Sequence, residues 1–252
     1  MAGRWSSPPP KVRADNLVLG DETTQMTEPA IIFGASGGIG AALADATEAR
    51  GHAPVFRFSR QGGDFDLTDE ASIAACAARA AEAGPPRLVI VATGLLSRGN
   101  QRPERAIRDF DPDWMAENFA INAIGPALIA KHIAPLLPRS HRAVMAFLSA
   151  RVGSISDNRL GGWHSYRASK AALNMLVKGI ALELARTRPE AICLTLHPGT
   201  VETDLSAPFR SGNDTGVITP AQSATALLDV IDQLTPADSG KCYGWDGLEI
   251  PA

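Results

Sequence analysis

Tyr166 and Lys170 lie four residues apart in the segment Tyr-Arg-Ala-Ser-Lys, and together they could exchange a proton with a substrate. Residues at this spacing share one face of a helix. A free tyrosine has a pKa of about 10, which is too high for efficient proton exchange at neutral pH. An ammonium group close by favours the phenolate and lowers that pKa. We therefore predict an acid–base pair; the alternative is a helix on which the two residues coincide by chance.

A glycine-rich segment, Gly34–Gly40, follows the short apolar run Ala30–Phe33 and precedes an alanine-rich helical stretch. Gly34 can make the tight turn out of a strand, Gly38 lets the backbone approach a pyrophosphate, and Gly40 permits close packing of the helix. The free N–H groups at the start of the helix favour phosphate oxygens. We predict a dinucleotide site here; the alternative is an ordinary strand-to-helix turn.

The end of the next predicted strand, Pro54–Phe58, bears on which nicotinamide cofactor is bound. An acidic residue there normally binds the ribose 2′-OH of NAD. Here the strand is followed by serine and Arg60, and Arg57 precedes its last residue. A guanidinium matches a 2′-phosphate, so we predict that Arg60 favours NADP(H), with NAD(H) possible. Alternatively, both arginines are solvated surface residues. Asp66 and Leu67 are expected to meet the adenine.

Strand-like and helix-like segments alternate from Ala30 onward. The predicted strands are Ala30–Phe33, Pro54–Phe58, Arg87–Ala92, Ala143–Leu148, Ala191–Leu196 and Lys241–Trp245. The predicted helices are Gly38–Arg50, Asp69–Ala83, Asp111–Leu137 with a bend or break near Pro126 and Pro135, Ser165–Arg186 and Pro220–Leu234. This alternation predicts the α/β class: a single-domain Rossmann fold with a doubly wound parallel sheet and helices on both faces.

Composition excludes several other classes. The chain has 252 residues, 45% of them hydrophobic, and a net charge of −3, so it carries no electrostatic footprint for nucleic acid or an anionic membrane. No apolar run approaches the roughly 18 residues that span a bilayer. The three cysteines form no CxxC pair and the histidines are dispersed, so reduced thiols, no metal site and a cytoplasmic location are expected.

The chain is predicted to consist of two regions. Residues 1–29 are proline-rich and polar, and we predict a disordered extension. A plainer alternative is that translation starts at Met26. Residues 30–252 are predicted to form one Rossmann-fold domain that contains both the cofactor and the substrate sites.

The motifs occur together in the order and spacing of the short-chain dehydrogenase/reductase family, which residues 30–252 resemble. The shared motifs are Gly34–Gly40, Asn122, Tyr166-x-x-x-Lys170 and Pro198-Gly199. The stretch Gly153–Tyr166 is similar to the C-factor-like branch and to small carbonyl reductases. The resemblance implies an NAD(P)(H)-dependent oxidoreductase that reduces a ketone or aldehyde to an alcohol. The alternative is a catalytically weak protein that uses the fold as a cofactor sensor or signal.

The resemblance also implies roles for individual residues. Tyr166 would protonate the substrate oxygen, Lys170 would hold the nicotinamide ribose, and Asn122 would anchor a water that links Lys170 to solvent. The alternative for Asn122 is a polar helix residue bonded to nearby backbone, and for Thr203 a helix N-cap. The full set of expected cofactor residues is Gly34, Ser36, Gly37, Gly38, Ile39, Gly40, Arg60, Asp66, Leu67, Ala92, Thr93, Gly94, Tyr166, Lys170, Pro198, Gly199, Val201 and Thr203.

Three positions depart from the family pattern. Phe33 replaces the usual threonine before the first glycine, and Val91–Gly94 replaces the usual Asn-Asn-Ala-Gly. The third departure concerns the serine that normally polarises the substrate carbonyl, because Ala150 aligns with that position. Ser149 comes one residue early and would face away from the substrate in a regular strand, although a bulge could redirect it. We therefore include Ser149 as a catalytic candidate.

The expected partners are a small carbonyl or alcohol substrate and further copies of the chain. The helix Ser165–Arg186 is apolar nearly all round, which predicts burial against a second subunit in a homodimer or homotetramer. The loops 95–105, 154–163 and 204–217 are expected to shape the substrate site, the last as a mobile lid. The substrate itself is not specified by the sequence.

Overall fold

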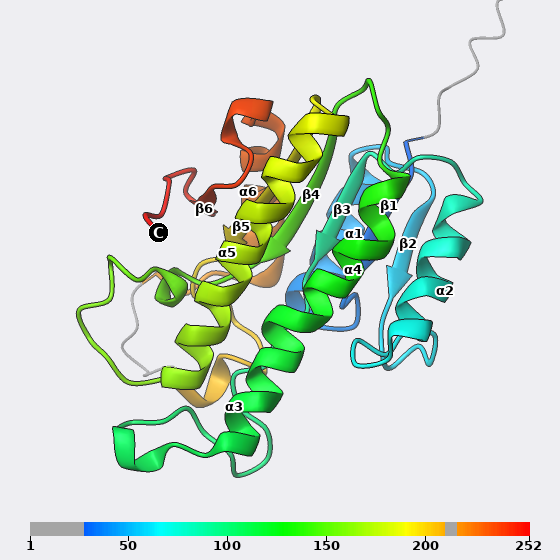
Figure 1. Ribbon diagram of the computed structural model, residues 1–252. Coiled ribbons are helices and arrows are strands. Elements are labelled where there is room, and N and C mark those ends of the chain that lie inside the picture. The colour runs from blue at the N-terminus through cyan, green and yellow to red at the C-terminus, as the bar shows by residue number, and fades with distance from the viewer. Residues whose placement is uncertain (1–27, 210–215) are drawn as a thin grey trace, which may run out of the picture.

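A six-stranded parallel sheet forms the centre of the computed structural model, which describes residues 28–209 and 216–252 (Figure 1). Its order is β2-β1-β3-β4-β5-β6, and every neighbouring pair is parallel. The strands are β1 (Ala30–Phe33), β2 (Val55–Phe58), β3 (Leu88–Val91), β4 (Ala143–Leu148), β5 (Ala191–His197) and β6 (Cys242–Gly244). The predicted α/β class and single Rossmann domain are confirmed.

Helices cover both faces of the sheet. In Figure 1, α2 (Glu70–Ala81), α4 (Gly125–Ile133) and α5 (His164–Thr187) lie in front of it, while α1 (Gly38–Ala49) and α6 (Pro220–Gln233) lie behind. Each face has its own apolar core. Ile73, Ile129 and Leu173 pack on one side, and Leu43 and Leu227 pack on the other. The strands are buried on both faces, which explains their continuous apolar sequences.

The strand order reverses at β1, because β2 lies on one side of it and β3 on the other. Ligands of open α/β sheets bind at such a switch point, beyond the carboxyl ends of the strands. Gly34 begins the turn there with a φ of 85°. A Cβ on this residue would lie 3.0 Å from the backbone carbonyl of Ala92, which follows β3. Glycine at position 34 therefore permits both the turn and the close approach of the neighbouring chain.

The predicted long helix before β4 is interrupted by a wider turn rather than by a break. It starts as α3 (Pro112–Phe119), passes through a π-turn at Ala120–Ile124, and continues as α4 to a final 3₁₀ turn. The N–H of Gly125 donates to the carbonyl of Ala120, five residues earlier. Pro126 has no N–H to give to the carbonyl of Asn122, so the regular helical pattern cannot continue there. Asn122 consequently lies within the π-turn.

The helix Pro112–Leu136 is the one helix in the described ranges that is long and apolar enough to cross a membrane, judged by length and composition alone. The sequence has no uninterrupted apolar run long enough to span a bilayer, because polar residues such as Asn118 and Asn122 interrupt this helix. Both asparagines are fully buried, and α3 and α4 contact α5. These contacts are typical of a core helix in an α/β domain.

Other expectations differ from the structure in detail. Most predicted strands and helices end within one or two residues of the observed bounds. The helix α5 buries one face in the domain, whereas the apolar Met175 and Leu182 on another face are exposed. The predicted N-terminal extension lies almost entirely outside the described residues, as does part of the predicted lid.

Candidate active site

The glycine turn forms a cradle at the start of α1. A Cβ on Gly40 would collide with the carbonyl of Gly34, and one on Gly38 would lie 3.0 Å from Cγ2 of Thr203. Gly37 caps α1 with extended backbone and offers no side-chain bond to the first-turn N–H groups. These N–H groups are therefore available to an anion at the positive end of the helix.

Three cavities adjoin one another along the carboxyl edge of the sheet. We call them the Arg60 cavity, the glycine-turn cavity and the Tyr166 cavity, with volumes of about 590, 490 and 660 Å³. Neighbouring cavities share lining residues, so together they form one groove. Every residue expected to bind the cofactor lines one of them: Gly34, Ser36, Gly37, Gly38, Ile39, Gly40, Arg60, Asp66, Leu67, Ala92, Thr93, Gly94, Tyr166, Lys170, Pro198, Gly199, Val201 and Thr203.

Thr93 gives an independent sign that this groove fits a polar ligand. Its hydroxyl is buried but has no hydrogen-bond partner in the structure. It lines both the Arg60 cavity and the glycine-turn cavity. A buried hydroxyl without a partner is costly, and a ligand that bonds to it would remove that cost. The orphaned hydroxyl and the glycine cradle together fit a dinucleotide laid across the switch point.

The two arginines near the end of β2 have different surroundings. Arg57 donates to Asp45 at 2.7 Å and pairs with Glu48 at 2.9 Å, both on α1. The surface alternative is therefore correct for Arg57. Arg60 forms no ion pair within the described residues and lines the groove beside Asp66. Hydrogen bonds from Thr68, with a smaller contribution from the Arg60 charge, lower the pKa of Asp66.

Tyr166 and Lys170 lie on the buried face of α5, as their spacing predicts. The Lys170 Nζ donates to the carbonyl of Leu148 at 2.8 Å and lies 5.9 Å from the centre of the Tyr166 ring. Burial lowers the pKa of Lys170 to about 8 and raises the pKa of Tyr166 to about 12. The sequence predicts a lowered pKa for this tyrosine, whereas burial raises it. The Lys170 ammonium is directed at the Leu148 carbonyl.

Asn122 joins the groove to α5. Its side chain accepts from Leu95 N–H and donates to Leu95 carbonyl, both at 2.8 Å, and it also donates to Ser169 Oγ at 3.0 Å. The two bonds to Leu95 agree with the alternative proposed from sequence, in which Asn122 bonds nearby backbone. A Cβ on Gly94 would lie 3.7 Å from Asn122 Oδ1 and 3.8 Å from Lys170 Nζ. Asn122 thus fixes the turn that passes over Lys170.

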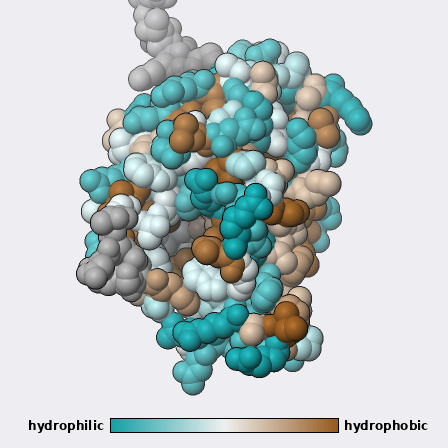
Figure 2. All heavy atoms as spheres, turned by 90° about the vertical axis from the view of Figure 1, so that its left-hand side faces the viewer, coloured by the Kyte–Doolittle hydropathy of each residue, from teal (hydrophilic) through white to brown (hydrophobic). Residues whose placement is uncertain are grey.

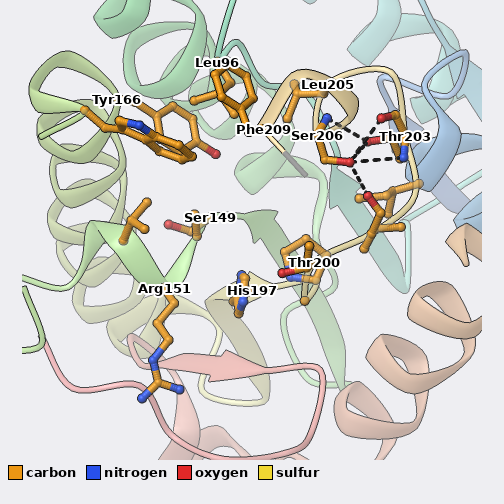
Figure 3. A pocket seen from close by; sticks show the side chains of 17 residues that line it. Leu96, Ser149, Arg151, Tyr166, His197, Thr200, Thr203, Leu205, Ser206 and Phe209 are labelled. Atoms are coloured by element: carbon orange, nitrogen blue, oxygen red, sulfur yellow. Dashed lines mark hydrogen bonds between the residues drawn. The ribbon is translucent and has the colours of Figure 1, made fainter. Parts of the chain in front are cut away.

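The structure also shows where Ser149 and Ala150 point. Both line the Tyr166 cavity. The Ser149 hydroxyl donates to Asn174 Oδ1 on α5 at 2.8 Å, and in Figure 3 it points away from the centre of the cavity. The Tyr166 hydroxyl points into the cavity. Ser149 is therefore close to the site, but its proton is already directed at another acceptor.

The segment after β5 forms the opposite wall. Gly199 has a φ of 85°, and the Pro198 carbonyl accepts from Ser223 at 2.7 Å. Thr203 begins a turn in which its carbonyl accepts from Ala207 at 2.9 Å, while its own side chain lies against the glycine turn. Thr203 thus both starts a turn and faces the cofactor groove.

Sequence reasoning did not single out several residues of the Tyr166 cavity. Trp163 makes edge contacts with Tyr166 at 6.3 Å and with Phe209 at 5.3 Å between ring centres. His197 contributes an imidazole whose Nδ1 is buried without a partner, and burial, followed by the Arg151 charge, lowers its pKa to about 4. Only the position of His197 directly before Pro198-Gly199 could have drawn attention to it.

The surface around the site is mixed. Figure 2 shows apolar and polar side chains intermingled on the left-hand side of Figure 1, and the described residues form no single large apolar patch on this face. Within residues 28–209 and 216–252, no group of three metal-ligating side chains is arranged to hold a metal ion.

Comparisons with known proteins agree with this geometry. Residues 60–214 match the sequence model of the short chain dehydrogenase family. The chain belongs to the short-chain dehydrogenase/reductase family, whose members are NAD(P)-dependent oxidoreductases.

Relatives include the C-signal protein of Myxococcus xanthus, 38% identical over 58% of this chain and 83% of the relative. A 1-hydroxy-2-glutathionyl-2-methyl-3-butene dehydrogenase from a Rhodococcus species is 35% identical over 72% of this chain and 76% of the relative. An NADPH-bound carbonyl reductase from chicken fatty liver has a similar structure, with a TM-score of 0.75, 25% identity, and coverage of 90% of this chain and 94% of that one.

Proposed function

We propose that this protein is an NADPH-dependent carbonyl reductase that converts a ketone or aldehyde to an alcohol. The observation that carries the proposal is the Tyr166 hydroxyl, which points into a cavity that adjoins the glycine-turn groove. Carbonyl reduction requires a proton donor and a dinucleotide site that meet at the same substrate group.

The residues of the groove would hold the cofactor along its length. Arg60 and Asp66 would meet the adenosine end, the glycine turn would bind the pyrophosphate, and Lys170 would hold the nicotinamide ribose. When bound, the nicotinamide supplies the hydride. NADP(H) is preferred because Arg60 is unpaired within the described residues and no acid occupies its position, while NAD(H) is the alternative.

Proton delivery then falls to Tyr166. Because burial raises its pKa to about 12, the phenol holds its proton at neutral pH. The oxygen that results from hydride addition to a carbonyl is an alkoxide, a stronger base than a phenolate, so it can take this proton. The Lys170 ammonium, 5.9 Å from the ring centre, would stabilise the phenolate that remains.

The test is NADPH oxidation with a panel of ketones, aldehydes and quinones. We expect turnover with some of them, and a loss of about 10²-fold or more in kcat for Tyr166→Phe, as for a general acid. Tyr243→Phe is the matched control, because Tyr243 bonds Asp238 away from the groove. An unchanged rate for Tyr166→Phe would disprove the role of Tyr166.

A second candidate is a cofactor-binding sensor or signalling protein. Two observations favour it: Ala150 supplies no hydroxyl to the cavity, and the similar Myxococcus protein is named C-signal. The buried Tyr166, Lys170 and Asn122 favour the enzyme. Robust turnover of any carbonyl compound would exclude a purely binding role.

We also propose a homodimer or homotetramer that associates through α5, in a soluble cytoplasmic protein. The exposed Met175, Leu176 and Leu182 on this helix support association. Light scattering of the purified chain, with Met175→Lys as the perturbing variant, measures the oligomeric state. A monomer at all concentrations would contradict this proposal.

A further inference from the structure

Glu104 is a buried carboxylate that contacts the first turn of the catalytic helix. It lies in the loop between β3 and α3, and only 3% of the residue is exposed. Its Oε2 accepts from the Ser165 N–H at 3.1 Å, and its Oε1 accepts from the Ser165 hydroxyl. Its backbone carbonyl accepts from the Trp163 N–H at 2.6 Å.

The helix α5 has no cap of its own. Trp163 occupies the N-cap position in left-handed backbone, with a φ of 51°, and makes no side-chain capping bond. The first N–H groups of a helix have no partner within it. Glu104 therefore supplies from a distant loop the acceptors that a serine or aspartate N-cap would normally give, and its carboxylate lies at the favourable end of the helix dipole.

The surroundings of Glu104 are unusual for a purely structural cap. No cation pairs with it among the described residues. The nearby Arg167 guanidinium is instead held by the carbonyls of Gly162 and Val152, at 3.0 and 3.3 Å. Burial of an unpaired carboxylate is unfavourable, and a local N-cap would avoid it.

The bonds of Glu104 hold two residues that come just before Tyr166 in the chain. Ser165 directly precedes Tyr166, and Trp163 makes an edge contact with the Tyr166 ring and with Phe209 across the cavity. The loop that carries Glu104 also contributes Leu96 to the Tyr166 cavity. The Glu104 carboxylate thus holds Ser165 and its backbone carbonyl holds Trp163, so one residue connects the loop of the substrate wall to the turn that precedes the proton donor.

We infer that Glu104 is a positioning residue, which holds the first turn of α5 so that Tyr166 and Trp163 face the substrate cavity in a fixed geometry. The inference rests on the proposed role of Tyr166 as proton donor. It adds a residue that touches neither substrate nor cofactor and acts through Ser165 and Trp163.

The kinetic test compares Glu104→Gln with Asp109→Asn. Asp109 is the matched control, because its exposed carboxylate accepts from Arg105 and Ala106 N–H groups in the same loop. We expect Glu104→Gln to lower kcat about tenfold or more, with smaller changes in KM and in the Kd for NADPH. Asp109→Asn should leave all three nearly unchanged. Equal losses in both variants would reduce Glu104 to a loop-stabilising residue and overturn the inference.

Ionisation of Tyr166 gives a test that needs no turnover. The chain has two tyrosines, so Tyr243→Phe leaves Tyr166 as the one tyrosine whose ultraviolet absorbance changes on ionisation. The charged group placed against its ring is Lys170, whose Nζ lies 5.9 Å from the ring centre. Loss of the Glu104 bonds loosens the first turn of α5 and gives water more access to the phenol, so the pKa of Tyr166, which burial raises, should shift downward. An unshifted titration would show that Glu104 does not act on Tyr166.

A double variant separates the inference from the proposed function. Glu104→Gln and Ser165→Ala should together cost less in kcat than the sum of the two single effects, because both act on the bond between the Glu104 carboxylate and the Ser165 hydroxyl. Additive losses would overturn the inference. Should the wild-type protein reduce no carbonyl, the proposed function fails, while the titration of Tyr166 still decides whether Glu104 acts on it. Ser165→Ala carries the same titration if Glu104→Gln does not fold.

Discussion

Replacement of Arg60 by alanine tests the cofactor preference directly. Arg60 lines the Arg60 cavity beside Asp66 and forms no ion pair within the described residues, so its guanidinium is available to a ligand. In NADPH the 2′-phosphate would meet it, whereas NADH offers only a neutral hydroxyl. The variant should therefore weaken NADPH binding and leave NADH binding nearly unchanged.

The magnitude follows from the exposure of Arg60. Two unit charges about 4 Å apart attract by about 1 kcal/mol in water and by about 4 kcal/mol near a protein surface. Arg60 is exposed, which favours the lower half of this range. A loss of about 1.4–2.8 kcal/mol corresponds to a tenfold to hundredfold rise in the Kd for NADPH. The effect should shrink as salt is added.

Arg57→Ala is the matched control for this experiment. Arg57 belongs to the same strand end, but Asp45 and Glu48 hold its guanidinium against α1. The assay is titration of cofactor fluorescence with NADPH and NADH at low and high salt. Two results would refute the assignment of Arg60 to the 2′-phosphate. One is that Arg60→Ala weakens the binding of NADPH and NADH equally, and the other is that Arg57→Ala reduces the preference for NADPH as much as Arg60→Ala does.

Three further predictions concern the reacting centre and its support. Burial lowers the pKa of Lys170 to about 8, so its ammonium is lost as the pH rises through that value, and kcat should fall on the alkaline side. A kcat that stays constant up to pH 10 would contradict the role of Lys170. Ala150→Ser adds a hydroxyl to the Tyr166 cavity and should raise kcat about tenfold or more, measured with the best carbonyl substrate; no gain would mean that the carbonyl is polarised elsewhere. Gly40→Ala forces a Cβ against the Gly34 carbonyl and should lower the free energy of unfolding by about 1–3 kcal/mol, measured by denaturant titration. Gly179→Ala adds a Cβ in open space within the helix α5 and tests the glycine effect alone.

The parts of the fold that depend on local sequence could be predicted. Continuous apolar runs predicted the strands. The glycine turn and the Tyr166–Lys170 spacing predicted the groove and the proposed reacting centre. These signals are local, because a turn needs glycine at one residue and a helix face needs a spacing of three or four.

Features that depend on contacts between distant segments could not be predicted. The bonds between Glu104 and Ser165 join residues 61 positions apart, and nothing near Glu104 indicates them. The direction of the Ser149 hydroxyl depends on Asn174 of α5. The pKa of Tyr166 depends on burial by the whole domain, so the lysine four residues away was a poor guide to it.

The π-turn at Ala120–Ile124 has a consequence for how such a site can arise. A π-turn amounts to an α-helix with one additional residue in a single turn. The wider turn takes up this residue within one turn of the helix, so deletion of one residue there would close it and leave α3 close to its present orientation relative to α4. Trp114 and Asn118, both buried in α3, would then stay in the core. A helix with this π-turn and a helix without it differ by one residue. The change from one to the other therefore needs the insertion or deletion of one codon, which substitutions cannot reproduce.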